Sequence, residues 1–167
     1  MRSVRKKCND ILRNINIPAP FEINRFCDNI AKHTGRDLKL LPVKELGSPA
    51  PCGMLLSTKE MDYIFYEPNT SRLHSDHIIL HEIGHILWGH MRSIHSDGEL
   101  LARLMPDLDP ALVKRMLGRV RYSSEEEMQA EFLASLIRSK AGVLPDEERN
   151  RSQGVNSAMV DAFHFIR

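Results

Sequence analysis

The sequence predicts an α+β fold that is mainly helical and contains a small three-stranded sheet. Apolar residues recur at helical spacing before and after a central segment, and that segment, residues 38–66, holds three short runs of strand character. Directly after the last run, a predicted helix carries two histidines and a glutamate at metal-binding spacing. We therefore expect one domain over residues 1–167, with the sheet beside the histidine-bearing helix.

Two helices are expected within residues 1–36. The first covers residues 2–16, where apolar side chains return every three or four positions. The segment Pro18-Ala19-Pro20 separates it from a second helix that ends near Gly35, because proline interrupts a helix and glycine often terminates one. We expect both helices to pack over the sheet.

Three strands are expected within residues 37–67. Residues 38–41, 54–57 and 62–66 are short apolar runs, and turn-forming residues separate them. The last two runs are connected by the four residues Thr58-Lys59-Glu60-Met61. We therefore expect these two runs to form a hairpin.

A metal site is predicted on a helix over residues 74–90, with Ser75 as its N-cap. Because helical residues are about 100° apart, His81 and His85 lie one turn apart on one face and can bind the same ion. Glu82 follows the first histidine and can serve as general base. Most neighbouring residues are apolar, so burying these polar groups without a ligand would be costly. Zinc suits this site, and manganese or iron can also occupy such nitrogen and oxygen donors.

A catalytic zinc site needs a third protein ligand, and two kinds of candidate lie downstream. His90 is nearest, but on a continuing helix it would lie about 140° from His85 and face away from the ion, so we interpret it as a helix-end residue beside the expected C-cap at Gly89. Glu127 opens a predicted helix over residues 124–140, which has a capping-box start and an apolar stripe at helical spacing. Glu131 follows one turn later, so one of the two acids can ligate while the other orients a ligand. Such acids usually form a solvated helix start, but the histidine motif lacks a third ligand, and this favours Glu127 as that ligand.

A peptidase also needs a donor that stabilises negative charge on the substrate oxygen. Tyr122, His74 and His77 are candidates. For Tyr122 simple packing is the competing interpretation, and for His77 it is support of a metal ligand through a hydrogen bond. Cys52, in Pro51-Cys52-Gly53, is similar to the thiolate that caps zinc in some latent proteases, although a packed thiol at a strand start is preferred.

Together these segments resemble the ImmA/IrrE family of small zinc peptidases. That family pairs an HExGH helix with a later helix of the form E-x-x-A-x-x-F-A, and residues 74–90 and 127–134 follow the two patterns in order. Leu133 stands where the family has phenylalanine, and Arg138 follows Ile137 in place of the family's Leu-Met-Pro ending. These departures affect the assignment of the residues that would line the substrate side of the site more than the assignment of the metal ligands.

The resemblance implies a gluzincin-type zincin fold in which His81, His85 and Glu127 bind zinc and Glu82 is the catalytic base. It implies a cytoplasmic metallo-endopeptidase with few protein targets, chiefly helix-turn-helix repressors that control transcription in mobile elements and stress responses. In zincins, a sheet edge beside the metal helix binds the substrate main chain as an added strand, and we expect the same use of the sheet here.

Composition excludes several other classes. The 23 basic and 22 acidic residues leave a net charge of +1, which does not indicate direct nucleic-acid binding. No apolar run is long enough for a secretory signal or a membrane span. Three scattered cysteines fit a reduced, cytoplasmic protein, and nothing indicates the oligomeric state.

Helices are also expected from Pro110 to Gly118 and over residues 155–166.

Two other functions fit the same residues. Peptide deformylases and some metal-dependent ribonucleases also place paired histidines on a helix, and the identity of the third ligand, Glu127 or His90, would distinguish them. Alternatively, the protein keeps the zincin fold and acts by binding alone. It would then be a regulator or a toxin–antitoxin component that sequesters a repressor without proteolysis.

Overall fold

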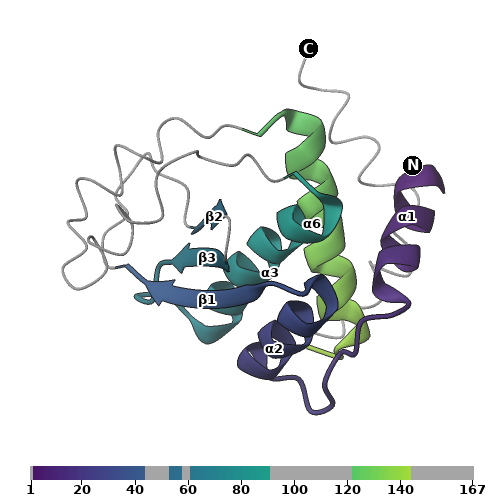
Figure 1. The fold of residues 1–167 in the computed structure, drawn as a ribbon. Helices are drawn as coiled ribbons and strands as arrows, with labels where there is room; N and C mark the ends of the chain where they lie inside the picture. The colour runs from purple at the N-terminus through teal and green to yellow at the C-terminus, as the bar shows by residue number, and fades with distance from the viewer. Residues whose placement is uncertain (1, 44–52, 58–60, 91–121, 144–167) are drawn as a thin grey trace.

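The computed structural model of the protein describes residues 2–43, 53–57, 61–90 and 122–143. These residues form four helices and one three-stranded mixed sheet, in agreement with the predicted α+β class (Figure 1). The helices expected at 110–118 and 155–166 lie outside the described residues, as does Cys52. No helix in the described part of the chain is both long enough and apolar enough to cross a membrane.

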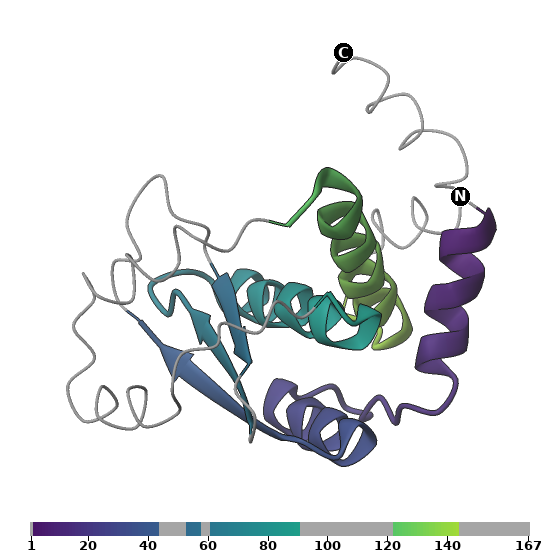
Figure 2. The same ribbon diagram turned by 45° about the horizontal axis from the view of Figure 1, so that its top comes forward.

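Helices α1 (Arg2–Leu12) and α2 (Ile23–Thr34) precede the sheet, as predicted, but α1 ends four residues before the expected end at residue 16. Gly35 ends α2 in the left-handed conformation, with a φ of 69° that glycine adopts without strain. Helix α2 contacts the first strand, but the main partner of α1 is the last helix, α6 (Ser124–Lys140). The expectation that both helices cover the sheet is therefore wrong for α1. Figure 2 shows α2 and α3 beside this small sheet and α1 beside α6.

The sheet consists of β1 (Asp37–Pro42), β2 (Gly53–Ser57) and β3 (Met61–Tyr66) in the order β1-β3-β2. Strands β2 and β3 are antiparallel and consecutive, which confirms the predicted hairpin. Strand β1 pairs with β3 in parallel. Within the described ranges, β2 is thus an edge strand, and its five residues are all buried.

Helix α3 (Arg72–Trp88) carries the histidine motif. It begins after Ser71, whose side chain accepts a hydrogen bond at 3.3 Å from the backbone N–H three residues later. It ends at Gly89, which has a left-handed φ of 77°. The helix expected over residues 74–90 therefore begins and ends two residues earlier, and its N-cap is Ser71, four residues before the expected Ser75. The first turn is exposed, so the apolar periodicity that marks the rest of the helix does not extend into it.

Helix α6 has the predicted bounds, Ser124–Lys140, and crosses α3 at close range. Its start is the predicted capping box, in which Ser123 and Glu126 each accept a hydrogen bond from the other's backbone N–H. At the crossing, a Cβ on Gly84 would lie 2.8 Å from the Ala130 carbonyl oxygen and 2.9 Å from its Cα. Only glycine permits this approach, which brings the first two turns of α6 over the histidines.

Candidate metal centre

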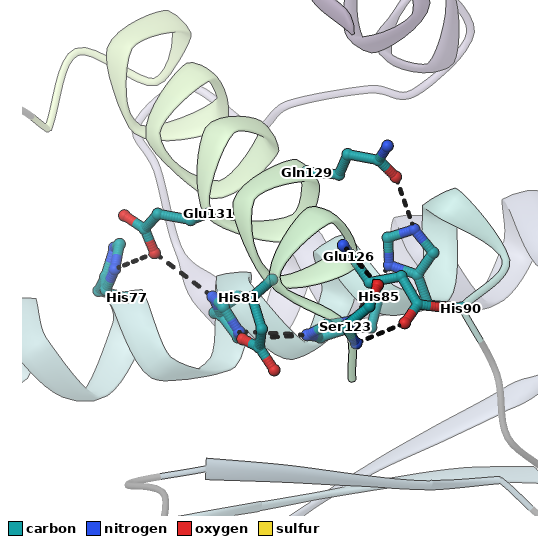
Figure 3. A network of polar contacts seen from close by, with 9 residues as sticks. His77, His81, His85, His90, Ser123, Glu126, Gln129 and Glu131 are labelled. Atoms are coloured by element: carbon teal, nitrogen blue, oxygen red, sulfur yellow. Dashed lines mark hydrogen bonds and ion pairs between the residues drawn. The ribbon is translucent and has the colours of Figure 1, made fainter. Parts of the chain in front are cut away.

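Three of the predicted site residues meet where α6 crosses α3. His81 and His85 come from consecutive turns of α3, and Glu127 comes from the first turn of α6. The two Nε2 atoms are 3.2 Å apart, and Glu127 Oε2 lies 3.1 Å from His81 Nε2 and 3.9 Å from His85 Nε2. Figure 3 shows the two histidine rings turned toward each other beneath α6. Within the described ranges, no other group of three such side chains converges in this way.

The spacing of these three atoms is compatible with one shared metal ion. Zinc–ligand bonds of about 2.0–2.1 Å place tetrahedral ligand atoms about 3.3 Å apart. The separations of His81 Nε2 from His85 Nε2 (3.2 Å) and from Glu127 Oε2 (3.1 Å) are close to that value, and the separation of His85 Nε2 from Glu127 Oε2 (3.9 Å) is longer. Two imidazole nitrogens and one carboxylate oxygen are donors that zinc binds readily. His81, His85 and Glu127 could therefore hold a metal ion.

A hydrogen-bonded carboxylate orients His81. Glu131 Oε2 lies 3.3 Å from His81 Nδ1 and 3.1 Å from His77 Nε2, and an Arg138 guanidinium nitrogen lies 3.4 Å from His77 Nδ1. Hydrogen bonds from His77, and then from His81, hold the pKa of Glu131 far below its usual range. If His81 donates from Nδ1, its Nε2 is left for the ion. His77 therefore contacts the residue that orients a ligand, which supports the second of its two interpretations.

His85 is almost completely buried, with 1% of its surface exposed. The Tyr122 ring stacks on it with centroids 3.6 Å apart and planes at 15°, consistent with packing as the role of Tyr122. Burial, together with the neighbouring His81 and His90 rings, lowers the pKa of His85 to about 3. A histidine binds a metal ion in its neutral form, so this environment favours the ligating form of His85.

The position of His90 differs from the expected one. We expected a side chain facing away from the site, but His90 Nδ1 lies 3.1 Å from His85 Nδ1. The helix does not continue, and the left-handed Gly89 turns the chain back toward α3. Gln129 Oε1 contacts the other nitrogen of His90 at 2.9 Å. The expected C-cap at Gly89 is confirmed, but neither contact of His90 was predicted.

Glu82 is buried against the edge strand. Only 6% of its surface is exposed, and burial raises its pKa to about 7, while the charge of His81 and a hydrogen bond from the Leu55 backbone act in the opposite direction. Gly53 provides the space for this side chain, because a Cβ there would lie 3.0 Å from Glu82 Oε1 and 2.3 Å from Ile78 Cγ2. Nothing in the sequence pattern marked Gly53 as the residue that makes room for Glu82.

Two further candidates are not part of this group. His74 is exposed in the first turn of α3, about two turns before His81, and is not brought to the three ligand atoms. Cys52 lies outside the described residues, whereas Cys8 and Cys27 are buried free thiols.

An open cavity of about 460 Å³ lies beside the group, lined by residues that include Lys7, Trp88 and Gln129, but none of the three candidate ligands lines it.

Comparisons with protein-family models, with curated proteins and with solved structures found no match. The structure supports a possible His/His/Glu metal group, with both histidines on one helix of a mixed α+β fold. The zincin fold family, the choice of metal and the reaction are proposals that go beyond this group.

Proposed function

We propose that the protein is a zinc-dependent endopeptidase of the zincin type. The observation that carries this proposal is the convergence of one potential ligand atom each from His81, His85 and Glu127 within 4.8 Å of one another, with the buried Glu82 directly after the first histidine. Catalytic zinc sites commonly use three protein ligands of this kind and keep a further position for water or substrate.

Each side chain has a defined role in this proposal. When bound, a divalent metal ion polarises the scissile carbonyl and makes a coordinated water more acidic. Glu82 would accept a proton from water as the water oxygen bonds to the scissile carbonyl carbon, and would return it to the amine nitrogen as the C–N bond breaks. A pKa raised toward neutrality suits a group that must both accept and release a proton near pH 7. His81 and His85 present Nε2, and Glu127 contributes a negatively charged oxygen.

The edge strand β2 suggests how a substrate is bound. Within the described ranges β2 pairs only with β3, and its Leu55 backbone contacts Glu82. An extended peptide that adds to this edge would run past Glu82 and the metal group, but all five residues of β2 are buried, so the edge has to become exposed before a peptide can pair with it. We therefore propose an extended protein segment as the substrate. The resemblance to the ImmA/IrrE family supports a cytoplasmic location and a helix-turn-helix transcriptional repressor as the target.

Substitution of Glu82 by glutamine tests the proposal. We expect Glu82→Gln to keep about one zinc per chain by elemental analysis while cleavage of a peptide library falls by roughly 10²- to 10⁴-fold. Glu22→Gln is the matched control, because Glu22 lies at the start of α2 and makes no side-chain cap bond. Absence of zinc from the wild-type protein, or equal cleavage by wild type and Glu82→Gln, would refute the proposal.

The same variant examines the binding alternative. If the protein sequesters a repressor without cutting it, a reporter of repression should respond equally to wild type and Glu82→Gln. If the protein is a peptidase, the variant should leave the repressor intact and the reporter silent.

A further inference from the structure

We infer that Glu125, Gln129 and His90 form a hydrogen-bonded chain that fixes the proton of His85 on Nδ1 and so keeps Nε2 free for the metal. The role in metal binding rests on the proposed function, but the position of the proton does not. Figure 3 shows Gln129 on α6 reaching His90, whose ring lies against His85. His90 is thus a positioning residue, and it does not itself bind the ion.

The chain begins with a group that can only accept. Gln129 Nε2 donates to the Glu125 carboxylate at 3.0 Å, one turn earlier on α6. This bond sets the orientation of the Gln129 amide, because the nitrogen must face the carboxylate. Gln129 Oε1 is therefore the atom presented to His90, and a carbonyl oxygen only accepts.

Each following step is determined by the previous one. His90 Nε2 lies 2.9 Å from Gln129 Oε1, so this nitrogen carries the proton and donates. A neutral imidazole has one donor and one acceptor, which leaves His90 Nδ1 as an acceptor. That atom faces His85 Nδ1 at 3.1 Å, so His85 Nδ1–H donates. The lone pair of His85 is then on Nε2, which faces His81 Nε2 at 3.2 Å and belongs to the metal group.

The geometry also excludes His90 as an alternative metal ligand in this arrangement. Its Nδ1 contacts the Nδ1 edge of His85, whereas the metal group uses the Nε2 edge of the same ring. The position of His90 is supported on another side by Trp88, whose ring lies 5.8 Å away at an interplanar angle of 20°. Packing alone could therefore hold the ring, so the experiment must separate packing from hydrogen bonding.

The proton positions can be measured directly. Long-range ¹H–¹⁵N NMR of the metal-free wild-type protein near pH 7.5 distinguishes the two neutral forms of each histidine. We expect His85 to carry its proton on Nδ1 and His90 to carry its proton on Nε2. A spectrum with His85 protonated on Nε2 would overturn the inference, whether or not the protein binds zinc.

Two substitutions of His90 then test the consequence for the metal. We expect His90→Phe, which keeps a ring but no acceptor, to weaken zinc affinity by about 10- to 100-fold. His90→Asn retains an oxygen that can accept from His85 Nδ1, so its zinc affinity should remain within about threefold of wild type. Affinity is measured by competition with a chromophoric chelator, and circular dichroism checks that each variant is folded.

A further pair of variants addresses the outer part of the chain. Gln129→Leu should weaken zinc binding, whereas Lys140→Leu, at the far end of the same helix, should not. Equal loss in His90→Phe and His90→Asn would show that ring packing and not the hydrogen bond matters, which would contradict the inference. Failure of wild type to bind zinc would instead refute the proposed function, and the NMR result would still decide the proton position.

Discussion

At the scale of single residues, Glu131 contacts two histidines through the same oxygen. Its Oε2 lies within hydrogen-bonding distance of both His77 and His81, and these contacts hold its pKa far below the usual range. The carboxylate of Glu131 is therefore charged at neutral pH. A charged acceptor makes the imidazole that donates to it a better metal ligand.

The first prediction concerns this carboxylate. We expect Glu131→Gln to weaken zinc binding by about 10- to 100-fold, because an amide orients His81 less strongly than a carboxylate does. Isothermal titration calorimetry with Zn²⁺ measures the change. Ser135→Ala is the control, since the Ser135 hydroxyl contacts only the other oxygen of Glu131, at 3.4 Å. Equal affinities for Glu131→Gln and wild type would show that this contact has no part in metal binding.

The second prediction concerns the buried thiols. Burial raises the pKa of Cys27 to about 12, with the charges of Asp28 and Asp76 adding to the effect, and burial raises the pKa of Cys8 to about 11, against an ordinary value of 9.0. The folded chain therefore keeps protons that the unfolded chain releases. This contribution to stability is fully present below pH 9 and is lost as the pH rises toward 11 and 12.

Each thiol should lower the free energy of unfolding by about 1.4 kcal/mol per pH unit over that interval. Urea unfolding in the presence of a reductant, at pH 8 and pH 10.5, measures the slope. The Cys8→Ala/Cys27→Ala double variant should show a flatter dependence on pH than wild type. Parallel slopes for the two proteins would contradict the prediction.

At the scale of secondary-structure elements, the crossing of α3 and α6 decides whether a metal group exists. Gly84 lets the backbones touch, and this contact places the first turn of α6 above the histidines. The atoms that a Cβ on Gly84 would meet are backbone atoms of Ala130. A side-chain rearrangement cannot relieve that clash, so one helix has to move.

The third prediction follows from this crossing. Alanine is favoured over glycine in a helix by about 1 kcal/mol, but overpacking costs about 1–3 kcal/mol, so we expect Gly84→Ala to be destabilising overall. The displaced α6 should also separate Glu127 from the histidines and weaken zinc binding. Chemical unfolding and zinc titration measure the two effects. Ala130→Gly should not rescue the variant, because the clash is with the backbone, and rescue would show that the helices meet differently.

At the scale of the whole molecule, a bound ion would connect parts of the chain that are distant in sequence. His81 and Glu127 are 46 residues apart and lie on different helices. Helix α3 also contacts β2 and β3, and α6 also contacts α1. An ion held by both helices would therefore join the sheet side of the molecule to its N-terminal side.

The fourth prediction is that zinc stabilises the fold. A ligand at 100 times its Kd contributes about 2.7 kcal/mol, provided that it binds only the folded state. For a chain of this size, this corresponds to a rise in Tm of roughly 5–10 °C. Differential scanning calorimetry with zinc and with a chelator measures the shift. Glu127→Ala should remove most of the gain, and an equal zinc-induced shift in that variant would exclude Glu127 as a ligand.

Local patterns in the sequence predicted the helices and strands, but such patterns carry no information about pairing between distant segments. The capping box at Ser123 and the apolar stripe after it predicted the bounds of α6, because both signals involve residues within a few positions of each other. The first turn of α3 is exposed, and even its apolar Leu73 faces solvent, so the turn does not continue the buried apolar pattern and the start of the helix was placed too late. The parallel pairing of β1 with β3 has no local signature and was not predicted.

For the site, the sequence by itself determined that His81 and His85 share one face of a helix, because helical periodicity alone places them there. Glu127 was expected from the missing third ligand and from the resemblance. Only the tertiary structure brought it within 3.1 Å of His81, through the backbone contact at Gly84. The return of His90 to His85 and the burial of Glu82 beside Gly53 were likewise tertiary outcomes. They depend on distances between segments, which no short-range pattern specifies.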